Sequence, residues 1–507
     1  MTGPPDRRAG GPVTVIPAEV DTLPEAVGRQ LADGARFLAL VARADPGGST
    51  TLQVLVGRSK QVVIVQSRLR PQQRRFPTLT TLTPAAAWYE REVHDLFGLV
   101  PEGHHRLQPL VLPRAAAVAA PRPGAGGGPN RLVPDTTPPS PDVVGEGLFT
   151  IPYGPVRSGI FETVEYLVET YGEDIPAVRP RVHYKHRGLD WRFTDLDADD
   201  AVLLAERVEG VASVAHASAF CQALEALADV EVPRPAQLLR VVHAELERIA
   251  NHLDSMLRHC EGAGQAVAYA RLGTHKEQVQ RLRAALCGHR FGRGVVVPGG
   301  VSGPPGCPLD DAMAAVSALE RALRADVELL MATPSFLDRL RGTGRLDAEL
   351  ATSYGALGPV GRGSEAGPDV RLERPYGGYR VLGFETVRVD AGDALGRQQV
   401  RVEEIRQGFH LVHQALDELD EDDPVADGRW RVPVASADGL TVGSVEAPQG
   451  ELLYLVEVAG GRLVRVKPRC PSFHNLALFP AAFRGDILTD FVFIEASFGL
   501  SFAGVAG

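Results

Sequence analysis

The stretch from Pro121 to Pro141 most constrains how this chain can fold. More than half of its positions are Pro or Gly, including the run Gly126–Gly128. Proline lacks the amide hydrogen that helices and central strands need, and glycine loses the most backbone entropy on ordering, so the stretch is typical of a linker. We place the linker at residues 114–147, between an N-terminal domain (1–113) and a C-terminal domain (148–507). We therefore expect an α+β multidomain protein.

The N-terminal domain has the sequence pattern of a small α/β fold. Short apolar or alternating segments bounded by turn residues predict strands. Thr83 and Pro84 predict a helix start, with Thr83 as the N-cap and Pro84 at the first helical position. The expected elements are a helix over 23–31 and strands over 37–42, 52–56 and 62–65.

The C-terminal domain is predicted to be mainly α-helical, with small antiparallel sheets at its two ends. The strongest helical signal runs from Gln237 to Leu257, where apolar residues alternate at spacings of three and four and form one stripe. Segments 452–457 and 462–467 predict a β-hairpin near the C-terminus.

Composition argues against several classes of function. The 507 residues include 53 basic and 63 acidic side chains, and their net charge of −10 does not indicate a nucleic-acid binder. No apolar run approaches the ~20 residues that span a bilayer, so we expect a soluble chain that reaches any membrane through partners. The five cysteines include no Cys-x-x-Cys pair and are expected to be reduced core thiols. No Gly-x-Gly-x-x-Gly follows a predicted strand, so direct NAD binding is not expected.

The predicted helix after Pro84 carries a dense polar motif. Residues Glu90 to Gly98 read Glu-Arg-Glu-Val-His-Asp-Leu-Phe-Gly, and Gly103-His104 follows. Taken alone, this pattern is typical of a charged helix with one solvated face. It also resembles the signature of the C-type hydrophilic subunit of complex I, NADH-quinone oxidoreductase. The resemblance implies that this segment contacts neighbouring subunits and carries no chemistry.

Motifs in the C-terminal domain resemble the D-type subunit of complex I and the related large subunit of nickel–iron hydrogenases. A C-type domain fused in front of them is similar to the formate hydrogenlyase (hydrogenase-3/4-type) large subunit. The motifs keep the family's order over more than 300 residues, which leaves little room for accident. The matching segments are 154–162, 183–188, 243–253, 358–364 and 469–475.

Two segments resemble the metal-binding segments of these hydrogenases but lack their cysteines. In the family, four thiolates from two Cys-x-x-Cys pairs hold the nickel–iron centre, because soft sulfur ligands suit those metals. The corresponding positions in this chain are Glu209, Ala212, Gly499 and Phe502. The resemblance therefore implies a hydrogenase-like fold without a metal site of its own.

The quinone-binding residues of complex I are also changed. The family's candidate proton donors to quinone are a tyrosine, which aligns with Gly210, and a histidine, whose loop here contains Arg157 and no histidine. By resemblance, Arg157, Arg207 and Gly210 line the equivalent cavity. Quinone binding stays possible, although both recognised donors are missing.

Several other polar residues are candidates for function. Glu162, Glu209 and His216 form a candidate proton path into the emptied cavity, and the resemblance places His186 and Arg187 near a partner's iron–sulfur cluster. A fixed guanidinium there would raise the cluster's reduction potential. The simpler interpretation is that the former metal cavity is filled with water and that Glu209 pairs with a nearby arginine. We expect His243 and His252 to be hydrogen-bonded core histidines.

The resemblance implies a subunit of a membrane-associated, complex-I-like or hydrogenase-like oxidoreductase. Its expected partners are an iron–sulfur small subunit (B-type) carrying a [4Fe-4S] cluster, a ferredoxin-like subunit and antiporter-like membrane subunits, at the cytoplasmic side of the cell membrane. Three hypotheses stay open: an electron-transfer subunit without a cofactor of its own, a non-catalytic structural subunit, and a hydrogenase with relocated ligands. The scattered cysteines argue against the third hypothesis.

Overall fold

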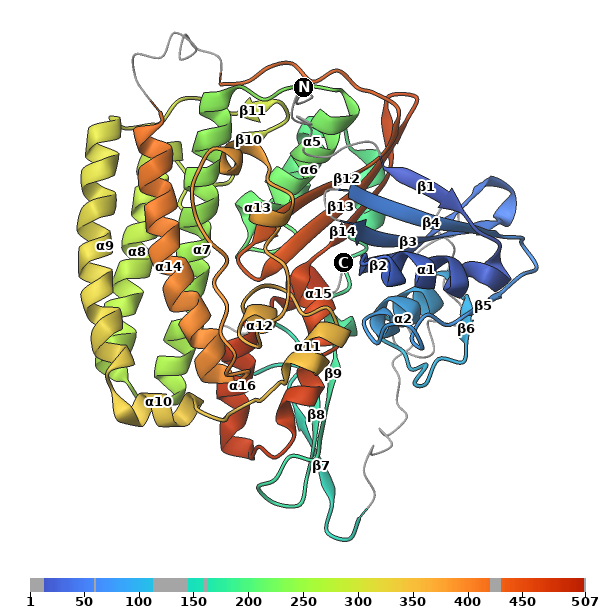
Figure 1. Ribbon diagram of the computed structural model, residues 1–507, viewed down its shortest axis with the longest axis horizontal. Helices are drawn as coiled ribbons and strands as arrows, with labels where there is room; N and C mark the ends of the chain where they lie inside the picture. Colours follow the sequence, from blue (N-terminus) through green and yellow to red (C-terminus); the bar gives the residue numbers. More distant parts are fainter. Residues whose placement is uncertain (1–12, 59–60, 113–144, 158–161, 420–429, 506–507) are drawn as a thin grey trace.

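The computed structural model describes residues 13–58, 61–112, 145–157, 162–419 and 430–505. Most of the predicted linker, 114–147, lies outside these residues. The described part contains a small sheet domain on one side and a larger, mainly helical region on the other (Figure 1). The expectation of an α+β multidomain fold is confirmed.

The N-terminal domain is a four-stranded sheet with two helices. The strands are ordered β1-β4-β3-β2, with β1 parallel to β4 and the other pairs antiparallel. The predicted helix and strands are all present, and the strands extend beyond their predicted ends. The elements are β1 (Thr14–Pro17), α1 (Leu23–Ala32), β2 (Arg36–Ala44), β3 (Thr50–Arg58), β4 (Gln61–Leu69), β5 (Arg75–Pro77), α2 (Ala86–Phe97) and β6 (Val100–Glu102).

Helix α2 starts later than predicted. It begins at Ala86, and Thr83 does not cap it. Backbone bonds from Ala86 and Ala87 to the carbonyls of Thr83 and Pro84 close a tight preceding turn instead. The Thr83 hydroxyl donates to the carbonyl of Ser353, 3.5 Å away in the C-terminal domain, so a tertiary contact replaces the local cap.

Two carboxylates of the polar motif on α2 accept hydrogen bonds from other segments of the N-terminal domain. Glu90 is fully buried and accepts from the Thr78 hydroxyl (2.6 Å) and the Leu79 amide (2.5 Å). Asp95 is also fully buried and accepts from the backbone amides of Leu110 and Val111. Both carboxylates therefore hold loops of the N-terminal domain. The solvated face that the pattern alone is typical of is therefore not found for these two residues. Contact with neighbouring subunits stays a prediction.

Four long helices form the bundle of the C-terminal domain, side by side in Figure 1. They enclose a continuous apolar core, to which the stripe predicted over 237–257 contributes. That helix extends beyond its predicted ends because the apolar spacing continues on both sides. The four helices are α7 (Arg234–Gly262), α8 (Ala266–Cys287), α9 (Leu309–Met331) and α14 (Ala394–Asp417).

Two antiparallel sheets flank the bundle, as predicted. The first consists of β7 (Phe149–Tyr153), β8 (Glu165–Thr170) and β9 (Ala177–Arg181). The second consists of β12 (Gly439–Ala447), β13 (Gly450–Ala459) and β14 (Arg462–Arg469), of which the last two form the predicted hairpin. Helix α6 (Ser213–Leu227) packs on β12 and β13 and separates this second sheet from α7.

Short elements connect these layers and carry two of the matched motifs, 358–364 and 469–475. They are α4 (Leu189–Arg192), α5 (Ala198–Ala205), β10 (Val296–Val297), β11 (Gly300–Val301), α10 (Pro334–Leu340), α11 (Ala348–Ser353), α12 (Gly358–Arg362), α13 (Val370–Glu373), α15 (Pro471–Leu476), α16 (Phe491–Phe498) and α17 (Phe502–Val505). Among the helices of the described ranges, none combines the length and apolarity needed to cross a membrane.

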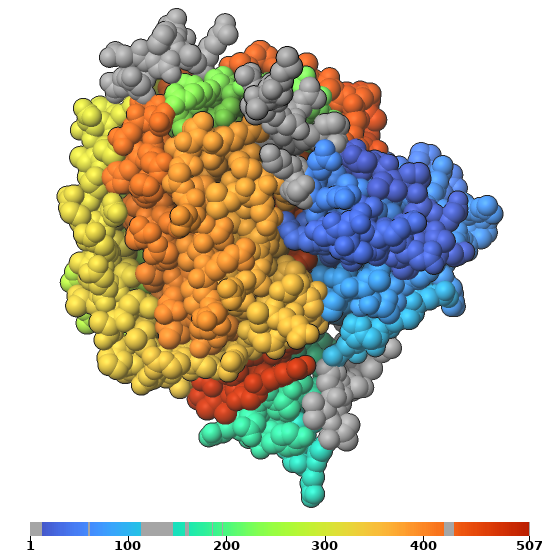
Figure 2. Space-filling view, in the orientation of Figure 1, coloured from blue at the N-terminus to red at the C-terminus, as the bar shows by residue number. Residues whose placement is uncertain are grey.

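The two domains lie against each other (Figure 2), and their interface contains buried charges. Glu451 at the start of β13 is fully buried and pairs with Arg36 of the N-terminal domain (2.7 Å) and with Arg469 (3.0 Å). The Tyr89 hydroxyl lies 2.9 Å from Nδ1 of His474. Because these contacts join residues of the two domains, they fix the sheet domain against the second sheet.

A set of seven buried charges links the bundle to β12. We call it the bundle network; its members are Glu245, Arg248, Arg362, Asp369, Arg371, Glu404 and Glu446. Arg362 pairs with Glu404 (2.6 Å) and with Glu446 (2.8 Å), and Arg371 pairs with Asp369 (2.7 Å). Burial alone raises the pKa of Asp369, but Arg371 outweighs burial and lowers it to about 2.

Candidate functional site

The segment between α5 and α6 builds the centre of the candidate site. Ala212, the N-cap of α6, has no side chain that can accept a hydrogen bond. The buried carboxylate of Glu247 on α7 takes this role and accepts from the amides of Val214 (2.9 Å) and Ala215 (3.0 Å). A side chain of the bundle thus fixes the start of α6, and with it the direction of His216.

His216 connects two other buried side chains. Its Nδ1 lies 2.7 Å from the hydroxyl of Tyr454 on β13, and its Nε2 lies 3.3 Å from Oε1 of Glu209. The first contact is a hydrogen bond, whereas the second is an ion-pair distance without hydrogen-bond alignment. Glu209, His216 and Tyr454 are all fully buried, and we call them the central triad. The triad can hold a proton away from water.

Burial and charge both act on Tyr454. Burial raises the pKa of its phenol well above the usual range, and the carboxylate of Glu209 raises it further. Tyr454 therefore stays protonated and can donate to Nδ1 of His216, which places the ring hydrogen on Nε2, the nitrogen 3.3 Å from Glu209. This tautomer gives the triad one direction of proton donation, from Tyr454 toward Glu209.

Arg187 lies beside the triad and ties together the two segments that carry metal ligands in hydrogenases. Its guanidinium donates to the carbonyls of Val208 (2.5 Å) and Ala503 (2.6 Å). Burial lowers the pKa of Arg187, and the carboxylates of Glu162 and Glu209 oppose this effect.

Glu162 belongs to the C-terminal end of the chain rather than to the triad. Its carboxylate accepts from the amide of Ala503 (2.6 Å) and from the hydroxyl of Ser501 (3.2 Å). The structure thus brings two of the three predicted proton-path residues, Glu209 and His216, into contact. The carboxylates of Glu162 and Glu209 both act on the guanidinium of Arg187.

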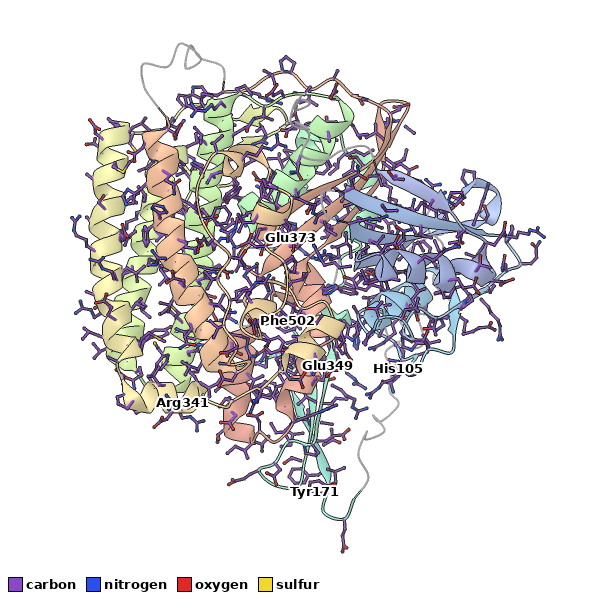
Figure 3. The ribbon with its side chains drawn as sticks, viewed as in Figure 1. His105, Tyr171, Arg341, Glu349, Glu373 and Phe502 are labelled. Carbon is purple, nitrogen blue, oxygen red and sulfur yellow. The ribbon has the colours of Figure 1, made fainter. Side chains whose placement is uncertain are left out.

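The C-terminal segment fills the space next to Glu209. A Cβ placed on Gly504 would lie 2.3 Å from Oε2 of Glu209 and 3.0 Å from Sγ of Cys470. Cys470 caps α15, and its sulfur accepts from the amide of Phe473. Phe502 is buried near the centre of the molecule, with its ring 6.1 Å from that of Tyr166 (Figure 3).

The residues at the four former ligand positions do not fit a nickel–iron centre. Ala212 and Phe502 offer no donor atom, and Gly499 has no side chain. A Cβ on Gly499 would lie 3.0 Å from Nη2 of Arg401, so a cation stands where a thiolate is needed. In the part of the chain that the structure describes, no group of three or more His, Cys, Asp or Glu side chains is arranged around a metal position.

Three residues predicted to line the cavity lie elsewhere. Arg157 is buried in an ion pair with Glu495 (2.8 Å), between the rings of Tyr153 and Tyr166. Arg207 and Gly210 are exposed at the surface, because the loop from α5 to α6 turns outward on both sides of Val208 and Glu209. Arg207 and Gly210 therefore contribute to an open surface rather than to an enclosed cavity.

The two core histidines behave differently. His252 fulfils the expectation, because its Nε2 lies 2.7 Å from Glu404. His243 does not, since neither ring nitrogen has a hydrogen-bond partner among the described residues. Burial, with the nearby charge of Arg283, lowers the pKa of His243 to about 3. His243 is therefore neutral at physiological pH.

Exposed aromatic, apolar and cationic side chains lie on the segments near Arg187. His186 lies on one of these segments, with its ring 6.0 Å edge-on to Trp191. The loop 288–294 joins the same surface, because the Gly294 amide donates to Glu206. Its exposed members include Trp191, Leu203, Arg207, Arg290 and Phe291. Such a surface is typical of a protein interface rather than of a small-molecule site.

Comparison with known proteins agrees with both halves of the architecture. Residues 17–122 match the family described as the 30 kDa subunit of respiratory-chain NADH dehydrogenase. Residues 263–435 and 431–506 match its 49 kDa subunit family. The carbon monoxide-induced hydrogenase of Rhodospirillum rubrum is 32% identical over 69% of this chain and 96% of its own length. The chain belongs to the 49 kDa subunit family.

Other members of this family show its range. Formate hydrogenlyase subunit 5 of Escherichia coli (strain K12) is 26% identical over 84% of this chain and 76% of its own length. The D-type protein of NADH-quinone oxidoreductase from Methylacidiphilum infernorum is 31% identical over 68% of this chain and 88% of its own length. These relatives are subunits of hydrogenase-like and complex-I-like membrane complexes.

Proposed function

We propose that this chain is a peripheral electron-transfer subunit of a membrane-bound oxidoreductase complex, without a metal centre of its own. The surface around Arg187 receives an iron–sulfur small subunit, which presents its [4Fe-4S] cluster there. The complex also contains ferredoxin-like and antiporter-like membrane subunits, on the cytoplasmic side. The relatives in hydrogenase-like and complex-I-like complexes support this placement.

The central triad carries this proposal. Glu209 replaces a former metal ligand, and His216 joins it to Tyr454 in a site from which water is excluded. Reduction of a quinone takes two electrons and two protons; the partner's cluster supplies the electrons, and Glu209 passes the protons. Proton transfer by a positioned group typically contributes 10²–10⁴-fold to a rate.

A structural role is the second candidate, and the packing of the C-terminal segment favours it. Gly504 contacts Glu209 so closely that an acceptor can reach this carboxylate only if the segment moves. If the segment stays in place, the chain holds the complex together and the triad is a remnant. Nickel–iron catalysis by this chain is disfavoured, because the four ligand positions lack thiolates.

Oxidation of the partner's cluster by a quinone separates these roles. The assembled complex, reduced with dithionite, is mixed with decylubiquinone, and the cluster's EPR signal is followed at pH 7. We expect Glu209→Gln to slow oxidation at least ~100-fold, whereas Arg341→Gln, an exposed arginine (61%) at the far edge of the molecule (Figure 3), leaves it unchanged.

The other outcomes are equally informative. Unchanged oxidation in Glu209→Gln would leave only the structural role. Loss of the small subunit on purification of Arg187→Ala, but not of Arg341→Ala, supports the docking surface. Nickel bound in proportion to the purified complex, with hydrogen turnover, would overturn both proposals.

A further inference from the structure

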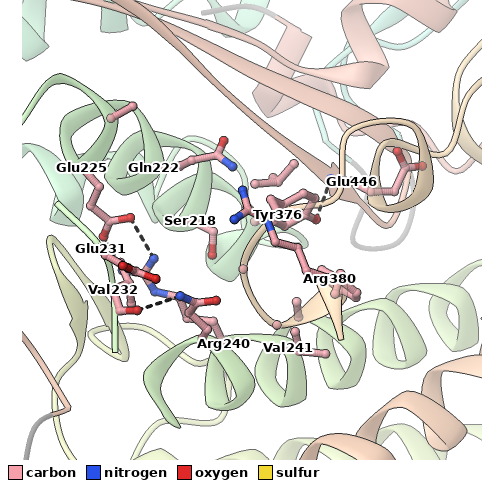
Figure 4. Close-up of a pocket in the computed structure, with 18 of the residues that line it drawn as sticks. Ser218, Gln222, Glu225, Glu231, Val232, Arg240, Val241, Tyr376, Arg380 and Glu446 are labelled. Atoms are coloured by element: carbon pink, nitrogen blue, oxygen red, sulfur yellow. Dashed lines mark hydrogen bonds and ion pairs between the residues drawn. The ribbon is translucent and has the colours of Figure 1, made fainter. Parts of the chain in front are cut away.

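A second candidate site lies in a pocket away from the central triad. The pocket has a volume of about 360 Å³ and opens between α6, the start of α7 and the segment 376–380 (Figure 4). This volume is within the range of pockets that bind small molecules. Its wall is formed by α6 residues that precede and follow His216, so the pocket lies on another face of the same helix.

The wall formed by segment 376–380 is held rigidly. The Tyr376 hydroxyl accepts from the amide of Glu446 (3.0 Å), and the Tyr379 hydroxyl donates to Glu245 (2.5 Å) of the bundle network. A Cβ on Gly378 would lie 3.0 Å from the side chain of Val241 on α7. The pocket is therefore preformed, and binding does not have to order this wall.

Most of the acidic side chains in the wall are already neutralised. Glu225 forms two hydrogen bonds with Arg240 (2.6 and 3.1 Å). Glu446 pairs with Arg362 (2.8 Å), and Glu247 is occupied by the amides at the start of α6. The inner wall thus presents little net negative charge to a ligand.

Hydrogen-bond donors converge on the interior. The Nε of Arg380 donates to the carbonyl of Pro375 (3.1 Å), and the guanidinium extends across the pocket toward Ser218 and Gln222 (Figure 4). The Gln222 carbonyl oxygen accepts from the amide of Ser444 (2.5 Å), so the nitrogen of its side-chain amide is the end that faces away from β12. Guanidinium and amide donors together recognise a carboxylate.

The mouth and the remaining wall limit what else the ligand contains. Glu231 lies on the connection from α6 to α7 and repels additional negative charge. Apolar side chains cover much of the rest of the wall; they include Val232, Val241, Ala244, Val445 and Pro448. Together these features disfavour polyphosphates and favour a compact apolar body, while the guanidinium of Arg380 disfavours a cation.

We propose that this pocket binds a small organic monoanion, an apolar molecule carrying one carboxylate, with Arg380 as the residue that recognises its charge. The site is independent of the quinone chemistry proposed above, because no member of the central triad lines it. A bound ligand lies against Tyr376 and Tyr379 and thereby next to the bundle network.

Binding of benzoate to the full chain tests this proposal by isothermal titration calorimetry. Benzyl alcohol and benzamidine serve as the neutral and cationic probes of similar shape. We expect saturable binding of benzoate, at least tenfold weaker binding of the other two, and about a tenfold loss of benzoate affinity in Arg380→Gln. The control Arg341→Gln removes an exposed arginine far from the pocket and leaves the affinity unchanged.

A cavity-filling variant separates a pocket effect from a surface effect. Ala244→Leu places a larger side chain in the wall, and we expect it to abolish benzoate binding while the Arg380 side chain is retained. The proposal is overturned if the wild-type chain does not bind benzoate saturably, if benzamidine binds as tightly, or if Arg380→Gln binds like the wild type.

Discussion

Two groups of buried charges lie in the same domain, and their surroundings differ. In the bundle network, Arg362 and Arg371 each contact two carboxylates at 3.1 Å or less. In the central triad, neither carboxylate oxygen of Glu209 receives an aligned hydrogen bond from a described residue, although His216 lies 3.3 Å away. The first group is satisfied internally and the second is not.

This difference indicates what each group is for. Unsatisfied buried polar groups cost free energy, and native proteins retain few of them without a reason. The bundle network therefore has the geometry of a structural element, whereas Glu209 is retained at a cost that stability does not explain. The side-chain amide of Gln449 next to β13 is also buried without a partner among the described residues. A functional ligand or water can satisfy such groups.

Removing a shared cation from the bundle network should have the largest effect. Arg362→Ala leaves Glu404 and Glu446 buried without their common partner. We expect the free energy of unfolding to fall by about 3–5 kcal/mol, measured by denaturant titration. Arg341→Ala removes an arginine whose ion pair with Asp338 is exposed. This variant should change the free energy of unfolding by less than about 0.5 kcal/mol. Equal effects of both variants would show that the buried charges of the bundle network contribute no more to stability than an exposed ion pair.

Glu90 extends the comparison to the N-terminal domain, because it is a buried carboxylate with no cation. Burial raises its pKa to about 7, and the Thr78 and Leu79 donors only partly oppose this. A raised carboxyl pKa stabilises the fold below the unfolded pKa of ~4.3, and this contribution is lost as the pH rises through 7. Between pH 4.5 and 7.5, the free energy of unfolding of the wild type should fall by about 3 kcal/mol relative to that of Glu90→Gln. Parallel stability profiles for the two proteins would contradict this expectation.

The hydroxyl of Tyr454 provides the one aligned hydrogen bond within the central triad. Tyr454→Phe leaves Nδ1 of His216 buried without its donor. We expect a loss of about 1 kcal/mol in the free energy of unfolding, and a shift of the His216 ring nitrogens in ¹⁵N NMR as the tautomer changes. An unchanged spectrum would show that Tyr454 does not set the tautomer.

The sequence anticipated elements whose signal is local. The α7 helix and the β13–β14 hairpin follow from apolar spacing within single segments. The start of α2 was misplaced because Thr83 bonds to Ser353, 270 positions along the chain. Likewise, Arg371 finds Glu245 across 126 positions, a separation that no local pattern encodes.

The candidate site was predictable only where its residues are neighbours in sequence. Glu209 and His216 lie seven positions apart, and the structure places them 3.3 Å from each other, whereas their role in proton transfer stays a prediction. Tyr454 was missed because it lies in an apolar strand, 238 positions from His216, and only the packing of α6 on β13 brings it there. Arg157 was misassigned because its partner Glu495 belongs to α16, far along the chain.

The stability of Glu209→Gln compares the two regions most directly. The variant removes the buried charge but keeps an oxygen that can accept from Nε2 of His216. If the central triad is retained for proton transfer, the free energy of unfolding should change by less than about 0.5 kcal/mol, or increase. A loss of about 2 kcal/mol or more in the same denaturant titration would show that Glu209 is a structural residue, like those of the bundle network.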